Sequence, residues 1–118
     1  MVRDIKVTER INRFIATITE QTQKGEIRWE KQSGSAHRYA RWNNNLLILG
    51  PAHPETDKVP RYLFVTPFDS PACLEINSED EDLGKGVLKL VALVEQVSKD
   101  EPAVDPFAVT DEMLSRLV

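Results

Sequence analysis

The chain of 118 residues has one cysteine, Cys73, and no long run of apolar residues. A lone cysteine excludes a disulfide within the chain and is typical of a reducing compartment. Apolar runs such as 46–49 and 91–94 are too short for a transmembrane helix, which needs about 20 residues. The opening residues Met-Val-Arg-Asp lack the apolar core of a signal peptide. We therefore expect a cytoplasmic protein without a membrane partner.

Motifs that carry catalysis or bind cofactors are also missing. His37, His53 and Cys73 stand in no recognisable nucleophile or metal-binding pattern. Leu83-Gly84-Lys85-Gly86 has the glycines and the lysine of a phosphate-binding loop. It follows four acidic residues, 79–82, which repel phosphate. We therefore predict a protein without catalytic residues, bound metal or cofactor.

The net charge of −4 is spread unevenly along the chain. Residues 1–45 carry nine lysines and arginines against five acids, whereas residues 46–118 carry six against fourteen. Such asymmetry fits either two surfaces for partners or two halves that attract each other within one fold. The second explanation is the simpler one, and we prefer it.

An amphipathic helix is predicted near the N-terminus. Its apolar side chains recur at helical spacing and form one stripe: Val7, Ile11, Phe14, Ile15 and Ile18. Gly25 is typical of a left-handed C-terminal cap. Ile27 and Trp29 then alternate with charged residues, which predicts a half-buried strand. Such a helix is not stable alone, so we expect its stripe and Trp29 to pack together on a sheet.

Short strands separated by turns are predicted over residues 36–42, 45–49, 61–66 and 72–76. The first of these strands has two faces, with His37, Tyr39 and Arg41 on one and Arg38, Ala40 and Trp42 on the other. Asn43-Asn44 predicts a tight turn into the next strand, because asparagine adopts positive φ more readily than most residues. Connections this short predict an antiparallel sheet.

A second long helix is predicted after Ser78. The run Ser78-Glu-Asp-Glu81 has the spacing of a capping box, and its acids suit the positive end of the helix dipole. The apolar stripe of this helix is Leu83, Val87, Leu90, Val91, Val94 and Val97. Gly84 and Gly86 either weaken the first turns or let another backbone approach closely.

These elements predict the α+β class: an N-terminal helix, a four- to five-stranded antiparallel sheet, a long helix and a short C-terminal helix in a two-layer sandwich. Residues 1–101 form the single domain in this prediction. Residues 102–118 are a linker and a short helix over 111–117. The apolar residues of this last segment are Phe107, Val109, Met113, Leu114 and Leu117. We expect them either to dock on the chain's own sheet, which we prefer, or to contact another chain, such as a second copy in a homodimer.

Basic and aromatic residues cluster in the first strands. The candidate binding surface consists of Arg28, Lys31, Arg38, Tyr39 and Arg41, with Trp29 and Trp42 interspersed. Aromatic rings and cations on a sheet can stack bases and hold phosphates. The alternative is that both tryptophans face the helices as core and leave the arginines in solvent. Because the whole chain is acidic, we prefer that alternative.

The run from Phe14 to Lys31 resembles the opening of small uncharacterised bacterial and mobile-element proteins. In those proteins a helix ends in the signature Thr-x-x-Gly-x-hydrophobic-x-Trp, which here reads Thr22-Gln-Lys-Gly25-Glu-Ile27-Arg-Trp29. Antiparallel strands and a closing helix follow. The resemblance implies this fold and a bacterial or phage origin, near genes of mobile elements, defence or immunity. It implies no established activity.

The leading hypothesis from the sequence is a non-enzymatic protein of immunity, inhibitor or regulatory type that binds another protein. A nucleic-acid-binding module that uses the basic and aromatic strands is the alternative. An unrecognised hydrolase comes third.

Overall fold

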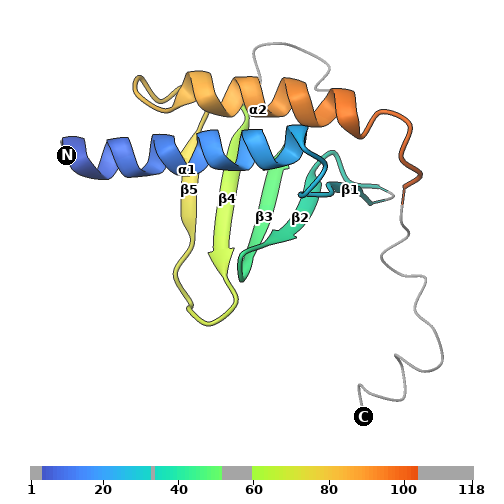
Figure 1. Cartoon of the computed structure of the whole chain (residues 1–118), viewed down its shortest axis with the longest axis horizontal. Coiled ribbons are helices and arrows are strands. Elements are labelled where there is room, and N and C mark those ends of the chain that lie inside the picture. The colour runs from blue at the N-terminus through green and yellow to red at the C-terminus, as the bar shows by residue number, and fades with distance from the viewer. Residues whose placement is uncertain (1–3, 33, 52–59, 104–118) are drawn as a thin grey trace.

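The computed structural model describes residues 4–32, 34–51 and 60–103. Two helices lie side by side across one face of a five-stranded antiparallel sheet, whose strands follow chain order from β1 to β5 (Figure 1). The predicted α+β class is therefore confirmed for the N-terminal helix, the sheet and the long helix. The predicted short helix over 111–117 lies outside the described residues. Among the described helices, none is long and apolar enough to cross a membrane.

Helix α1 (Ile5–Gln23) begins after Asp4, whose Oδ1 accepts a hydrogen bond of 2.7 Å from the backbone N–H of Lys6. Ile15 and Ile18 are fully buried as predicted, whereas Ile11 and Phe14 are only partly buried against the core. The expectation for Val7 is wrong, since this side chain is 46% exposed. The N-terminal end of α1 projects beyond β5 (Figure 1).

The segment after α1 leads to a short edge strand. Gly25 has φ +77°, which confirms the predicted left-handed cap. Ile27 and Trp29 are buried and alternate with exposed charged residues, but only β1 (Glu30–Lys31) pairs with the sheet. The Trp29 indole donates a hydrogen bond of 3.0 Å from Nε1 to Oγ1 of Thr22, which fixes this segment to the end of α1.

The central strands form two hairpins. Their bounds are β2 (Arg38–Trp42), β3 (Asn45–Gly50), β4 (Tyr62–Pro67) and β5 (Leu74–Asn77). Asn43 and Asn44 both have positive φ, at +48° and +62°, and Trp42 pairs with Asn45. This is the two-residue turn that the sequence predicted. Beneath the helices, the sheet contributes one apolar layer to the core: Ala40, Leu47, Leu49, Leu63, Val65 and Ile76.

Helix α2 (Gly84–Val97) begins later than predicted, and the capping box is wrong. The Ser78 hydroxyl accepts a hydrogen bond of 2.8 Å from the backbone N–H of Arg61 and is therefore engaged by the sheet. Asp80 instead accepts hydrogen bonds from the backbone N–H groups of Asp82 and Leu83, at 2.9 and 3.1 Å. The acidic run thus forms a turn ahead of the helix.

The core side of α2 follows the predicted stripe except at its end. Leu83, Leu90 and Val94 are buried together with two other valines of the stripe, but Val97 is 48% exposed. Ser98, the next residue, is buried instead. Its hydroxyl donates a hydrogen bond to the carbonyl oxygen of Val94 and accepts one from Nε of Arg38, so the buried polar group is paired.

Candidate binding face of the sheet

The face of the sheet that points away from both helices is lined by apolar and aromatic side chains. We call it the open face, and its residues are Tyr39 and Arg41 of β2, Leu46 and Ile48 of β3, and Tyr62 and Phe64 of β4. Arg41 is exposed and the other five are half-buried. The helices that the structure describes cover only the opposite face (Figure 1).

Strand register aligns the open face in rows. Tyr39, Ile48 and Phe64 are direct cross-strand neighbours, and Glu75 of β5 ends this row. The rings of Tyr62 and Phe64, two positions apart on β4, stack with centroids 5.9 Å apart and planes at 25°. Because side chains two positions apart share a face, these contacts make one continuous apolar surface across three strands.

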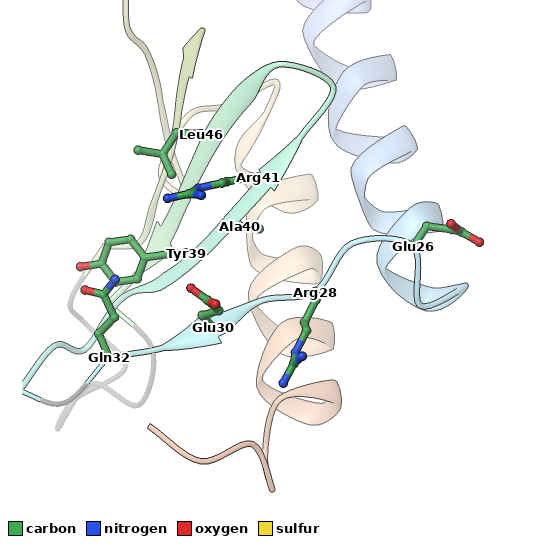
Figure 2. A pocket seen from close by; sticks show the side chains of 8 residues that line it. All are labelled: Glu26, Arg28, Glu30, Gln32, Tyr39, Ala40, Arg41 and Leu46. Atoms are coloured by element: carbon green, nitrogen blue, oxygen red, sulfur yellow. The ribbon is translucent and has the colours of Figure 1, made fainter. Parts of the chain in front are cut away.

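A groove of about 540 Å³ adjoins this surface at the β1 edge. Strand β1 pairs with β2 only at Glu30 and Lys31, so the chain before Glu30 diverges and leaves space beside Ala40 and Arg41. Figure 2 shows Arg41 and Leu46 together at one end of the group, with Glu30 between Tyr39 and Arg28. Tyr39, Ala40 and Leu46 give the groove an aromatic and apolar part, and its other lining residues are charged or polar.

The charges around the groove are of both signs. Arg28 and Arg41 line it together with Glu26 and Glu30. Nη2 of Arg28 also forms an ion pair of 3.0 Å with Oε2 of Glu101, although the arginine side chain remains 76% exposed. An exposed pair of this kind contributes little stability. Its structural effect is to hold the chain after α2 beside the groove.

Only part of the predicted binding surface shares the open face. Tyr39 and Arg41 lie there and Arg28 lines the adjoining groove, but Arg38 and Lys31 do not. Arg38 is 5% exposed, and its guanidinium donates to the Ser98 hydroxyl at 3.4 Å and to the carbonyl oxygen of His37 at 3.5 Å. Nζ of Lys31 donates to the carbonyl oxygen of Lys99 at 2.7 Å. Alternation along the strands turns both cations to the helix side, which corrects the expectation that Arg38 is solvated.

The two tryptophans also lie on the helix side. Trp29 is 2% exposed within the core. Trp42 is partly buried there, with its ring 6.1 Å from that of Phe14. The prediction that both face the helices is confirmed, so neither ring is available for stacking on the open face.

The residues with nucleophile or base chemistry are not brought together. The Cys73 thiol is exposed and accepts a hydrogen bond of 3.4 Å from the hydroxyl of Thr66. His37 lies next to Gly50, which pairs with Tyr62, four positions from Thr66 on β4. That separation is about 13 Å along a strand. Within residues 4–32, 34–51 and 60–103, no three histidine, cysteine or acidic side chains are grouped so that they could hold a metal ion, and His53 lies outside the described residues.

The apolar part of the open face was missed by the sequence reasoning. Residues 46–49 and 62–65 are continuous apolar runs. In an antiparallel sheet with helices on one side only, such runs place apolar side chains on the second face as well. The predicted two-layer sandwich, with both helices on one face of the sheet, already contained that signal.

No family model matches this chain, and the comparisons with curated proteins and with solved structures give no match. The resemblance of residues 14–31 to small bacterial and mobile-element proteins therefore stays a prediction.

Proposed function

We propose that this chain is a non-enzymatic protein-binding module whose open face is the interface. The supporting observation is the continuous surface of Ile48, Tyr62 and Phe64, which no described helix covers. Exposed apolar patches of this kind mark interaction sites in soluble proteins. Tyrosine, phenylalanine and arginine are also enriched at protein interfaces, where a polar rim surrounds an apolar centre. Arg28, Arg41 and Glu75 supply such a rim here.

An immunity, inhibitor or regulatory role in the bacterial cytoplasm is the concrete form of this proposal. The role rests on the resemblance of residues 14–31, and the cytoplasm on the sequence, which has one cysteine and no long apolar run. A small domain that presents one rigid apolar face suits the blocking of a partner's surface.

Nucleic-acid binding is the second candidate, and one observation favours it. The stacked rings of Tyr62 and Phe64 share the open face with Arg41, a combination that single-stranded nucleic acids use. Two observations weigh against it. Lys31 and Arg38 turn to the helix side. Glu26 and Glu30 line the same groove as Arg28, so the positive field that attracts phosphates is weak.

Affinity capture from a bacterial lysate with matched variants tests the proposal. Phe64→Glu and Arg41→Glu place a carboxylate on the open face. Leu88→Glu is the control, because Leu88 is 46% exposed on α2 in the other layer. We expect the wild type and Leu88→Glu to retain one partner, which both open-face variants lose. With the purified partner, calorimetry should show dissociation constants raised at least about tenfold, as for residues at the centre of an interface.

Thermal unfolding of each variant confirms that it is folded before capture. Equal binding by all four proteins would contradict the proposal. A labelled single-stranded RNA or DNA that binds the wild type with strong salt dependence, and is released by Arg41→Glu, would support the nucleic-acid alternative instead. At physiological salt we expect no such complex.

A further inference from the structure

The described chain ends close to β1, at the edge of the sheet. After α2, the carbonyl oxygen of Lys99 accepts a hydrogen bond of 2.7 Å from Nζ of Lys31, and Glu101 pairs with Arg28 at 3.0 Å. Both contacts fix residues 99–101 along β1, and Arg28 also lines the groove. Figure 1 shows the chain descending from the end of α2 to β1. The residues that follow Ala103 therefore start near the β1 edge of the sheet.

The chain that follows is long enough to cross that face. The described residues end at Ala103, and residues 104–118 remain. Fully extended, this segment spans about 50 Å at roughly 3.3–3.6 Å per residue. The sheet has five strands, so its width is about 19 Å at roughly 4.8 Å between neighbouring strands. Every strand of the open face is within reach, even when part of the segment is compact.

The chemistry of the segment complements that of the open face. Its apolar side chains include Phe107, Val109, Met113, Leu114 and Leu117, and it carries three acids against one arginine. The open face offers Ile48, Tyr62 and Phe64 at its centre, and the groove at its β1 edge carries Arg28 and Arg41 beside Glu26 and Glu30. Burial of the apolar side chains favours docking, and the two arginines can pair with acids of the segment.

We propose that residues 104–118 dock in the same molecule on the open face and enter through the groove at Arg28 and Arg41. The segment then covers the surface that a protein partner needs, so binding of the partner requires its release. That regulatory consequence rests on the proposed function, whereas the docking itself does not.

A spin label on the segment tests the docking in the full chain. Ser115→Cys in a Cys73→Ser background gives one attachment site, and Cys73→Ser keeps an acceptor for the Thr66 hydroxyl. In ¹⁵N-labelled protein, the amide signals of Arg41, Ile48 and Phe64 should broaden relative to the reduced label. The amide of Leu88, on α2 in the other layer, should not. Adding Leu114→Glu and Leu117→Glu should remove the broadening, because buried carboxylates oppose docking.

A mixed sample separates docking within one molecule from contact with a second copy. Spin-labelled protein without ¹⁵N is added to ¹⁵N-labelled protein without the spin label, and we expect no broadening. Broadening of the open-face amides in the mixed sample would show that the segment binds a second copy and would overturn the proposal. Broadening over the helices, or none at all, would overturn it as well. No partner is present in either sample, so a failure here leaves the proposed function to its own capture experiment.

Discussion

Replacing Trp29 by alanine is expected to lower the free energy of unfolding by about 3–5 kcal/mol. The indole is 2% exposed, so the change leaves a large cavity between α1 and the sheet. It also removes the donor that satisfies Oγ1 of Thr22, a residue that is itself 2% exposed. A buried polar atom without a partner adds about 1–3 kcal/mol to such a cost. Chemical denaturation measures the difference.

Trp42→Ala is the matched control for this prediction. Trp42 is a tryptophan of the same layer, but it is only partly buried, at the end of β2. Its replacement should cost clearly less than that of Trp29. A Trp29→Ala variant whose free energy of unfolding lies within about 0.5 kcal/mol of the parent, the range of ordinary surface substitutions, would show that Trp29 is not a core residue.

Gly84→Ala is expected to lower the free energy of unfolding by about 3 kcal/mol, the upper end of the usual range for overpacking. A Cβ at Gly84 would overlap with the carbonyl oxygen of Ser78. It would also lie 2.8 Å from the carbonyl carbon of the same residue. Both are backbone atoms, and the Ser78 backbone N–H is itself bonded to the carbonyl oxygen of Arg61 at 2.7 Å. The turn before α2 therefore has no room to move. Of the two explanations for this glycine, close approach of another backbone holds.

Gly86→Ala, two positions along the same helix, is the control. A Cβ there would lie 3.1 Å from Cγ2 of Ile15, a side-chain atom that can shift slightly. Alanine also has a higher helix propensity than glycine, by about 1 kcal/mol, which offsets the cost of this close contact. We expect a net change within about 1 kcal/mol. Equal stability of the two variants would contradict the close packing of α2 against the Ser78 turn.

The fold was predictable where one local rule decided the outcome. Positive φ at Asn43 and Asn44 followed from the tolerance of asparagine for that region. The burial of Ile15 and Ile18 followed from helical spacing. The capping box failed because the backbone of Arg61, distant in sequence, takes the Ser78 hydroxyl. The sequence of residues 78–81 alone gives no sign of this competing hydrogen bond from Arg61.

The candidate site was predictable only in part, for a related reason. Alternation placed Tyr39 and Arg41 on one face and Arg38 on the other, which the burial of Arg38 confirms. The predicted surface combined basic residues of both faces, although alternation placed Arg38 with Trp42 on the face that was expected to meet the helices. The apolar centre at Ile48 and Phe64 appears only when β3 and β4 are paired in register.

Chemical-shift mapping with the purified partner is the most direct test of the proposed interface on the open face. In ¹⁵N-labelled protein, the amides of Tyr39, Arg41, Ile48 and Phe64 should shift or broaden on addition of the partner, while Leu88 of α2 stays unchanged. Perturbations confined to α1 and α2, with β2, β3 and β4 unaffected, would contradict the proposal.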